Sequence, residues 1–377
     1  MKDHSRDFSL YIHVPFCASK CAYCDFLSFV DCSSMERYFS ALFNEIRVKG
    51  AGCDRAVDNI YIGGGTPSVA MRFLPQLGRV LRTSFGIKED AEISIECNPE
   101  SVTEEFVIAA RSLGVNRVSM GVQSLSDPLL KRIGRVHDRV RALDALSLLT
   151  RSFPSVGADV MVGLPDQTEK DLSETLDTLL SYPIDHLSCY SLILEKGTPL
   201  YREAKRGVFR QDDDLAVDLY DLATARLKRA GFERYEISNF CKNEAVCRYN
   251  TSVWQYGDYL GLGLGASSFV KDKQFPARRY KNTSDLCRYL TFNGVPLTKK
   301  KKIVREEGMR EFIMLGLRLS EGLSISRFNE IFGEDFYSLF GKACDRVSNC
   351  LDRVDDHLFI KSEYLYVSNS VISEIIF

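Results

Sequence analysis

The sequence predicts an α/β protein, with a partial parallel (β/α)6 barrel followed by a smaller, winged-helix-like α+β domain. Over the first two-thirds of the chain, six short β-rich runs alternate with amphipathic helical segments. This alternation is typical of parallel βα units. It stops near residue 240, and helical patterns with little β character follow. We therefore expect two domains, at residues 1–240 and 241–377.

The six β-rich runs lie at residues 10–14, 59–62, 92–97, 117–120, 158–162 and 186–190. A closed barrel of this kind needs eight strands, so six units predict an open barrel. In βα barrels the chemistry collects at the carboxyl ends of the strands. The residues that directly follow each run are therefore the first candidates for a functional site.

Helical segments with one apolar face separate the runs. A helix expected over residues 35–50 places Met35, Phe39 and Leu42 on one face, with Ser33 and Glu36 in the pattern of a capping box. Thr168 has the character of an N-cap for a second helix, and residues 212–214 precede a third. These helices are the expected crossovers between parallel strands.

The region after residue 240 predicts a small domain of a different kind. The basic run at 299–302 is most simply a solvated loop. A helix is expected from Glu306, a short helix over 325–331, and a β-rich run at 365–371. Helices followed by a small strand pair suggest the winged-helix-like arrangement, which at the level of fold does not imply DNA binding.

Composition indicates an ordinary globular protein. The apolar fraction is 45% and the charged fraction 27%, close to the globular average. A net charge of -2 gives no electrostatic reason to expect a nucleic-acid partner. The first eight residues lack the apolar core of a secretory signal, and no stretch is long and apolar enough to span a membrane. Twelve cysteines without an export signal favour a reducing compartment, so we expect a cytoplasmic protein.

Three cysteines follow the first β-rich run at close spacing. Cys17, Cys21 and Cys24 form a Cys-x3-Cys-x2-Cys pattern. Thiolates are the usual ligands of iron–sulfur clusters, and three of them leave one iron of a four-iron cluster open. A zinc site would show a second ligand pair, and a ferredoxin run a nearby fourth cysteine. A disulfide framework suits short secreted chains, and three unrelated buried thiols are an improbable reading of this spacing.

Further candidates stand where the next strands are expected to end. The second run leads into Gly63-Gly64-Gly65-Thr66-Pro67, whose glycines let the backbone approach a ligand closely. The third run carries Glu96, a carboxylate that is costly among apolar residues unless it meets a donor or a cation. Gln123, Arg135 and Asp159 follow the fourth run or lie in the fifth. Each has a structural alternative, such as an ion pair, but their shared placement favours one common pocket.

These motifs together resemble the radical S-adenosylmethionine (SAM) superfamily. Tyr-x-His-x-Pro-Phe-Cys before the cluster is similar to the oxygen-independent coproporphyrinogen III oxidase-like branch, and the resemblance covers nearly the whole chain. It implies that residues 1–240 form a radical SAM core and that Cys17, Cys21 and Cys24 bind one [4Fe-4S] cluster. The SAM pocket implied by the resemblance comprises Tyr11, Gly64, Gly65, Thr66, Glu96, Gln123, Arg135 and Asp159.

The resemblance also implies cofactors and partners. In this superfamily, an electron from the cluster splits the sulfonium of SAM and releases a 5'-deoxyadenosyl radical, so the cofactors carry the hard chemistry. An electron donor such as flavodoxin or ferredoxin is therefore expected. The C-terminal domain is expected to cover the mouth of the barrel, where it would keep stray hydrogen donors from a radical.

Two groups within this branch differ in function. The coproporphyrinogen III dehydrogenases decarboxylate two propionates to vinyl groups, whereas the HemW group is thought to bind heme and pass it to acceptor proteins. The dehydrogenases add a fourth cysteine two residues after the third, where this chain has Phe26, and carry a longer N-terminal extension. Both features favour heme as cargo and a heme-acceptor protein as partner. The dehydrogenase, with a porphyrinogen substrate, is the alternative, and a purely structural or electron-carrier role is a third possibility.

This chain departs from the group's pattern at the residues expected to bind heme. The chaperone group shows His-Asn-x-x-Tyr-Trp, and here Tyr249 replaces its histidine; a second family histidine is replaced by Ser267. Tyrosinate and cysteine thiolate both ligate heme in other proteins, so Tyr249 or Cys247 can serve. The alternative is that Tyr249 is a packed aromatic side chain. His13 and His137 lie near the expected active face and remain candidates.

Overall fold

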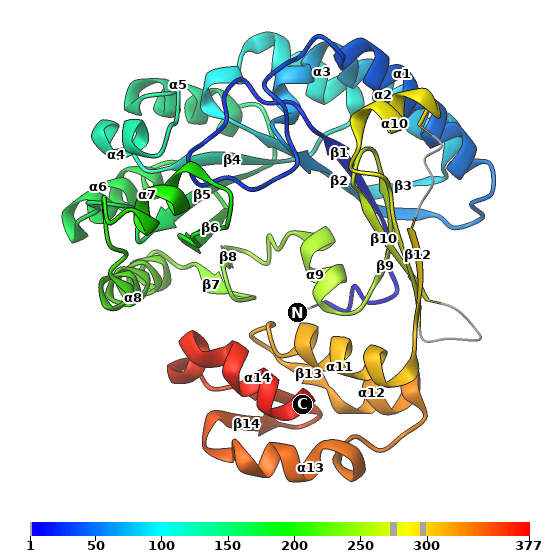
Figure 1. Cartoon of the computed structure of the whole chain (residues 1–377), viewed down its shortest axis with the longest axis vertical. Helices are drawn as coiled ribbons and strands as arrows, with labels where there is room; N and C mark the ends of the chain where they lie inside the picture. Colours follow the sequence, from blue (N-terminus) through cyan, green and yellow to red (C-terminus); the bar gives the residue numbers. More distant parts are fainter. Residues whose placement is uncertain (1, 272–276, 295–298) are drawn as a thin grey trace.

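The computed structural model describes residues 2–271, 277–294 and 299–377, and a twelve-stranded sheet dominates it (Figure 1). The strand order is β12-β11-β10-β9-β1-β2-β3-β4-β5-β6-β8-β7. Strands β1 to β6 stand in chain order and pair in parallel, each with the next. The sheet curves without closing, which confirms the predicted open barrel.

All six predicted β-rich runs are strands, several of them longer than expected. Their bounds are β1 (Phe8–Val14), β2 (Val57–Gly64), β3 (Ile87–Cys97), β4 (Arg117–Gln123), β5 (Ser155–Val162) and β6 (His186–Ser191). Side chains alternate between the two faces of a strand, so each strand presents one set of residues outward and another to the concave face. The concave face is the one on which the candidate residues meet.

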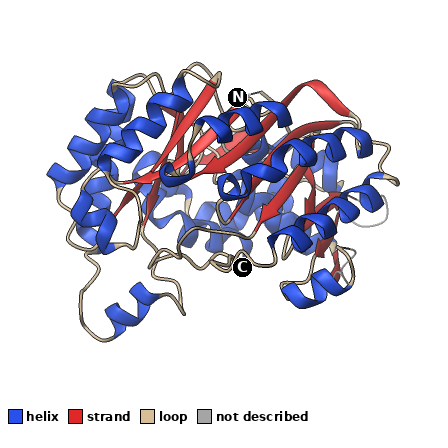
Figure 2. Cartoon of the chain, turned by 90° about the horizontal axis from the view of Figure 1, so that it is seen from above, coloured by secondary structure: helices blue, strands red, loops and turns tan. Residues whose placement is uncertain are grey.

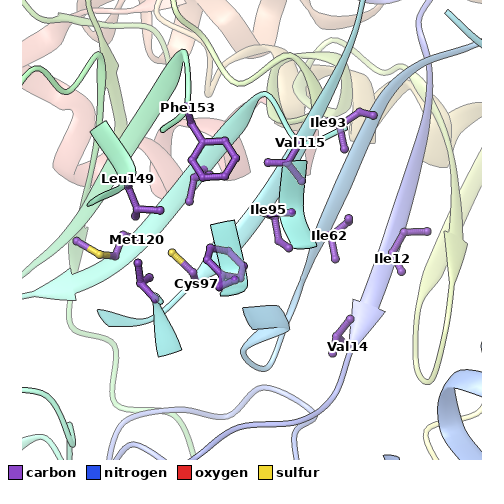
Figure 3. Close-up of a cluster of buried hydrophobic side chains, with 14 of the residues drawn as sticks. Ile12, Val14, Ile62, Ile93, Ile95, Cys97, Val115, Met120, Leu149 and Phe153 are labelled. Atoms are coloured by element: carbon purple, nitrogen blue, oxygen red, sulfur yellow. The ribbon is translucent and has the colours of Figure 1, made fainter. Parts of the chain in front are cut away.

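The outward set forms the hydrophobic core against the crossover helices. Figure 3 shows Ile12, Ile62, Ile95 and Met120 lying together on neighbouring strands, and all four are fully buried. The helices that cover this face are α1 (Met35–Gly50), α2 (Leu74–Ser84), α3 (Glu104–Leu113), α5 (Arg139–Thr150) and α6 (Glu169–Leu180). The short α4 (Asp127–Arg132) belongs to a separate cluster, in which Leu129 is buried with Met161 and Leu164. Figure 2 shows the helices packed along the sheet from above. Two short 3-10 helices, η1 (Pro67–Phe73) and η2 (Pro99–Ser101), follow β2 and β3.

Helix starts are set by local side-chain bonds. Thr168 caps α6 in a full capping box, in which its hydroxyl accepts from the Asp171 backbone N–H and the Asp171 carboxylate accepts from the Thr168 N–H. The capping box expected at Ser33 is wrong: the N-cap of α1 is Ser34, and no side chain bonds there. The Ser33 hydroxyl instead donates to Asp31 at 2.9 Å, because a nearer acceptor competes for it.

Beyond β6 the chain extends both edges of the sheet. On the β6 side lie α7 (Pro199–Lys205), α8 (Asp213–Arg229), β7 (Glu233–Arg234) and β8 (Asn239–Cys241). The other edge carries α9 (Arg248–Trp254), β9 (Asp258–Leu262), β10 (Ser267–Lys271), β11 (Ala277–Lys281), α10 (Leu286–Thr291) and β12 (Lys299–Ile303). Strand β9 pairs in parallel with β1, so this segment joins the barrel sheet. The domain boundary at residue 240 stays a prediction.

The basic run at 299–302 is an edge strand, and the expected loop is wrong. Its residues pair antiparallel with β11, from Ala277↔Ile303 to Lys281↔Lys299, while the lysine side chains stay exposed. Lysines on an edge strand discourage pairing with another chain, so the charges and the strand are compatible.

The C-terminal domain packs helices on a small antiparallel sheet of order β13-β15-β14. Its elements are α11 (Arg305–Gly316), β13 (Leu323–Ser324), α12 (Ile325–Phe332), α13 (Phe336–Arg346), η3 (Ser348–Cys350), β14 (Leu351–Val354), β15 (His357–Ile360), η4 (Ser362–Val367) and α14 (Ser368–Ile376). The predicted strand at 365–371 is wrong. Val371, Ile372 and Ile375 are buried at helical spacing on α14, so burial of that face sets the structure.

No helix in the described ranges is long and apolar enough to cross a membrane.

Candidate functional site

A cavity of about 340 Å³ opens at the carboxyl ends of the barrel strands. All three motif cysteines line it, together with seven of the predicted SAM residues: Gly64, Gly65, Thr66, Glu96, Gln123, Arg135 and Asp159. Tyr11 and Tyr249 do not line it. Within the described ranges, no residue beyond Tyr190 lines it either, so the C-terminal domain contributes nothing to its wall.

Backbone hydrogen bonds hold the cysteine loop in place at its base and on its flank. At the base, the Cys17 N–H donates to Phe29 O at 3.0 Å and the Phe29 N–H donates to Pro15 O at 2.7 Å. On the flank, the Ala22 N–H donates to Ile133 O, and its carbonyl accepts from the Leu200 N–H, both at 2.9 Å. These bonds hold the loop against α4 and α7, so the three thiols face the strand ends.

The Gly63–Gly65 turn presses directly on the cysteine loop. Gly64 has φ +116°, which L side chains rarely adopt. A Cβ added at Gly65 would lie 2.6 Å from Phe16 O and 3.0 Å from Cys17 Sγ. The Thr66 N–H donates to the same Phe16 carbonyl at 2.7 Å. Glycine is therefore required here by close packing of the two loops, and the backbone of the turn stays open toward the cavity.

Asn98 ties three parts of the site together. Its amide nitrogen donates to Thr66 Oγ1 at 3.0 Å, and its amide oxygen accepts from Arg135 Nη2 at 2.8 Å. Arg135 Nη1 lies 3.6 Å from Cys21 Sγ, and its Nη2 also donates to Gly121 O. Burial lowers the pKa of Arg135, but the neighbouring Tyr23, Cys21 and Glu100 outweigh this and raise it. A permanent cation therefore sits beside one of the thiols.

Two carboxyl groups face the cavity from β3 and β5. Glu96 accepts from Tyr61 Oη at 2.8 Å and from the Gly64 N–H at 3.1 Å. Burial raises the pKa of Glu96 to about 7, and the nearby Asp159 adds to the rise. Asp159 accepts from Ser119 Oγ at 3.0 Å, and burial raises its pKa too. Glu96 can therefore exchange a proton near neutral pH more readily than an exposed carboxyl.

Gln123 ends β4 in a strained conformation. Its φ is +67°, and the β4–β5 register shifts between Gly121 and Gln123. Non-glycine residues with positive φ cost free energy and cluster at ligand sites. The bulge turns the Gln123 side chain into the cavity wall.

Tyr11 and Tyr249 lie in an aromatic stack away from the cavity. The Tyr249 ring, on α9, stacks on Tyr61 with a centroid distance of 5.1 Å and on Tyr11 at 6.0 Å. Burial holds the pKa of the Tyr249 phenol well above its usual range, which disfavours a tyrosinate ligand. Cys247 is buried beside this stack, and burial raises its thiol pKa likewise. The stack favours the packed-aromatic reading of Tyr249.

The two candidate histidines are buried and do not line the cavity. His13 Nδ1 lies 3.1 Å from Tyr11 Oη, and its Nε2 lies 2.9 Å from Leu27 O. His137 Nε2 lies 3.3 Å from Val122 O, and its Nδ1 lies 3.5 Å from Glu100 Oε2 without forming a hydrogen bond. Neither ring faces the ligand space of this cavity.

Several residues in or beside the cavity were missed by the sequence reasoning. Asn98, Tyr61 and Tyr190 orient or extend the site, and each stands on or just after a strand of the barrel. Asn98 directly follows the predicted third run, so the strand-end rule could have found it. Tyr61 and Tyr190 read as ordinary β residues, and only the alternation of faces within the folded barrel assigns them to the site.

Comparison with known proteins agrees with this architecture. The profile of the radical SAM superfamily matches residues 11–179, and that of the HemN C-terminal domain matches residues 303–351. The structure of HemN from Escherichia coli, described as a coproporphyrinogen III oxidase and radical SAM enzyme, superposes with a TM-score of 0.83. That superposition covers 99% of this chain and 91% of HemN at 21% identity, so it speaks for the fold alone. The open parallel barrel and the three cysteines at its strand ends define the class of protein: the chain has a radical SAM core.

Relatives of assigned function identify the family to which the chain belongs within this superfamily. The heme chaperone HemW of Mycobacterium tuberculosis is 34% identical over 85% of this chain and 84% of its own length. The heme chaperone HemW of Bacillus subtilis is 32% identical over 88% and 89%. The chain therefore belongs to the HemW family of the radical SAM superfamily.

Proposed function

We propose that this protein is a heme chaperone, which binds heme and transfers it to acceptor proteins. The observation that carries the proposal is the match to proteins named heme chaperones along most of both chains. Phe26 supports it, since it lines the cavity, 62% exposed, where the dehydrogenase pattern has a fourth cysteine. The alternative is decarboxylation of coproporphyrinogen III.

We further propose that Cys17, Cys21 and Cys24 hold a [4Fe-4S] cluster and that SAM occupies the rest of the cavity. The three thiols line one cavity at the carboxyl ends of the strands, and three thiolates leave one iron of a four-iron cluster open to a further ligand. When bound, the pair supplies reductive cleavage chemistry. A flavodoxin or ferredoxin as electron donor and a cytoplasmic location belong to the same proposal.

The chain's own residues complement these groups. The Arg135 guanidinium, with Nη1 3.6 Å from Cys21 Sγ, places a positive charge beside the loop that would hold the negatively charged cluster. The Gly63–Gly65 backbone and the Glu96 and Asp159 carboxyls offer acceptors to an ammonium and to ribose hydroxyls. Asn98 holds Arg135 and the glycine turn in fixed positions relative to each other, so it is a positioning residue.

The first experiment separates the two functions. Protein with its cluster rebuilt would be incubated anaerobically with coproporphyrinogen III, SAM and a reductant, and mass spectrometry would look for loss of two carboxyl groups. The same preparation would be titrated with hemin and followed by its Soret absorbance. We expect saturable heme binding and no decarboxylated product. Decarboxylation, or the absence of saturable heme binding, would overturn the proposal.

A further inference from the structure

A second and larger cavity lies between the barrel and the C-terminal domain. Its volume is about 660 Å³, and it shares no lining residue with the cavity of about 340 Å³ beside the three cysteines, which we call the cluster cavity. We call the larger one the interdomain cleft, defined by the N-terminal segment, the end of α9, the end of β10, α11, β13, α12 and β15. Figure 1 shows the N-terminus between α9 and the C-terminal helices, where these elements meet. A volume in this range suits a small-molecule site.

The wall of the cleft is half apolar. Trp254 and Phe312 supply aromatic surface, and Leu319, Leu323 and Ile331 supply aliphatic surface. Apolar walls with a few polar groups are typical of pockets for flat organic ligands. A ligand that fills this cleft therefore has a sizeable apolar body.

The polar part of the wall contains two cations, Lys271 and Arg327, that make few hydrogen bonds. Lys271 donates one hydrogen bond, to Ser5 O at 3.1 Å, within the part of the chain that the structure describes. Arg327 bonds Asp3 and Ser5 O through its Nη atoms, while its buried Nε has no hydrogen-bond partner. Burial and the nearby Arg327 and Arg55 lower the pKa of Lys271 to about 8, although Asp258 and Asp3 act in the opposite direction. Cations crowded in this way favour an anionic group beside them.

Carboxylates in the wall do not remove this preference. Asp3 pairs with Arg327 at 3.2 Å, and Glu321 accepts from the Gln255 amide at 3.1 Å. Glu330 is exposed at the rim, where Arg6 is exposed as well. Lys271 and Arg327 therefore keep hydrogen-bonding capacity that these carboxylates do not use, and a ligand's carboxylates can accept from them.

The cleft also holds a histidine, whereas the other four histidines are buried outside both cavities. His4, His13, His137 and His186 each expose less than a tenth of their surface, and none lines the cluster cavity or the cleft. His357, on β15, lines the cleft, and no hydrogen bond to its ring nitrogens is found among the described residues. Histidine is a common axial ligand of heme iron.

We propose that the interdomain cleft is the heme site of this protein, with Lys271 and Arg327 binding the propionates and His357 ligating the iron. This assignment rests on the proposed function and names where it takes place. The cluster cavity is about half as large, and its lining contains no histidine among the described residues. We therefore assign SAM to the cluster cavity and heme to the interdomain cleft.

Hemin titration of the full-length protein tests the assignment. Arg327→Gln and Lys271→Met should each weaken hemin binding about tenfold, since each removes a charge-assisted bond to a carboxylate. His357→Ala should change the Soret maximum and the ferric electron paramagnetic resonance spectrum, because the axial ligand is lost. Lys342→Gln, which removes an exposed cation outside the cleft, is the matched charge control. Thermal unfolding of each variant verifies folding, and Lys271→Met decides the charge test if Arg327→Gln does not fold.

The outcomes separate this inference from the function on which it rests. If the wild-type protein shows no saturable hemin binding, the chaperone function and the cleft assignment both fall. If the wild type binds hemin but folded Lys271→Met and His357→Ala keep its affinity and spectrum, the assignment alone is overturned and heme binds elsewhere.

Discussion

The two cavities of this protein are built in different ways. The cluster cavity is assembled from loops that follow consecutive parallel strands, between Cys17 and Tyr190, and its groups are already bonded to one another. The interdomain cleft draws on the N-terminal segment, α9, the end of β10 and the C-terminal domain. Among the described residues, its Arg327 Nε has no hydrogen-bond partner, and no hydrogen bond to the ring nitrogens of its His357 is found. The comparison shows a pre-organised cofactor site beside a larger site suited to a cargo that enters and leaves.

A chain of aromatic rings lies between the two cavities. Tyr61 bonds Glu96 in the cluster cavity and stacks on Tyr249, which meets Tyr259 at a centroid distance of 6.4 Å. Further rings continue this contact path, from Tyr259 to Phe269 at 6.2 Å, Phe269 to Tyr256 at 4.7 Å, and Tyr256 to Phe312 in the cleft wall at 5.6 Å. The rings separate the two ligands while keeping both sites in one packed unit.

The largest expected effect is the loss of the cluster on Cys21→Ala. A third of the proposed thiolate ligands disappears, so iron content and the broad iron–sulfur absorbance of reconstituted protein should fall to background. Cys350→Ala, outside the motif, is the control. Hemin affinity should stay within about twofold, because the cleft shares no wall with the cluster cavity. A parallel loss of hemin binding would show that the two sites are one.

Asn98→Leu should disorganise the cluster cavity from its centre. The change leaves Thr66 Oγ1 and Arg135 Nη2 each without one partner, and an unmet buried polar group costs about 1–3 kcal/mol. Denaturant unfolding should show that loss, and calorimetry should show weaker SAM binding. Asn44→Leu removes an exposed hydrogen bond and is the matched control. Unchanged SAM affinity in folded Asn98→Leu would remove Asn98 from its positioning role.

Glu96→Gln should change the pH dependence of stability. The folded-state pKa of about 7 is raised above the ordinary glutamate value of 4.5, so the folded protein holds more protons than the unfolded chain between these values. The free energy of unfolding of the wild type should therefore fall as pH rises from about 4.5 to about 7. Glu96→Gln should remove this share of the slope, on the order of 1–3 kcal/mol.

Urea unfolding across that pH range, for wild type and variant, measures the difference. Glu36→Gln, at a side chain that is 74% exposed, is the control and should leave the slope in place. Parallel pH profiles for wild type and Glu96→Gln would contradict the raised pKa.

The smallest expected effect is that of Tyr249→Phe. The ring stacking on Tyr61 is kept, and no hydrogen bond to the Tyr249 hydroxyl is found in the described ranges. Stability should change by less than about 0.5 kcal/mol, and hemin affinity by less than about twofold. A changed Soret maximum would instead establish Tyr249 as the iron ligand.

The cluster cavity was largely predictable because its residues follow strands that the sequence marks clearly. Parallel strands bring their carboxyl ends to one edge, so Glu96, Arg135 and Asp159 could be placed together without coordinates. The cleft could not be predicted, since Lys271, Arg327 and His357 belong to separate elements that only domain packing unites. Local sequence patterns predicted the wrong secondary structure where burial in the folded domain determines it. Residues 365–371 are the end of η4 and the start of α14 rather than a strand.

The most direct test of the two-cavity account is simultaneous binding. SAM would be titrated by calorimetry into cluster-loaded protein, once alone and once saturated with hemin. The account predicts one SAM per chain in both titrations, with affinities within about twofold of each other. Competition, with hemin displacing SAM, would show that both ligands share the cluster cavity and would contradict the account.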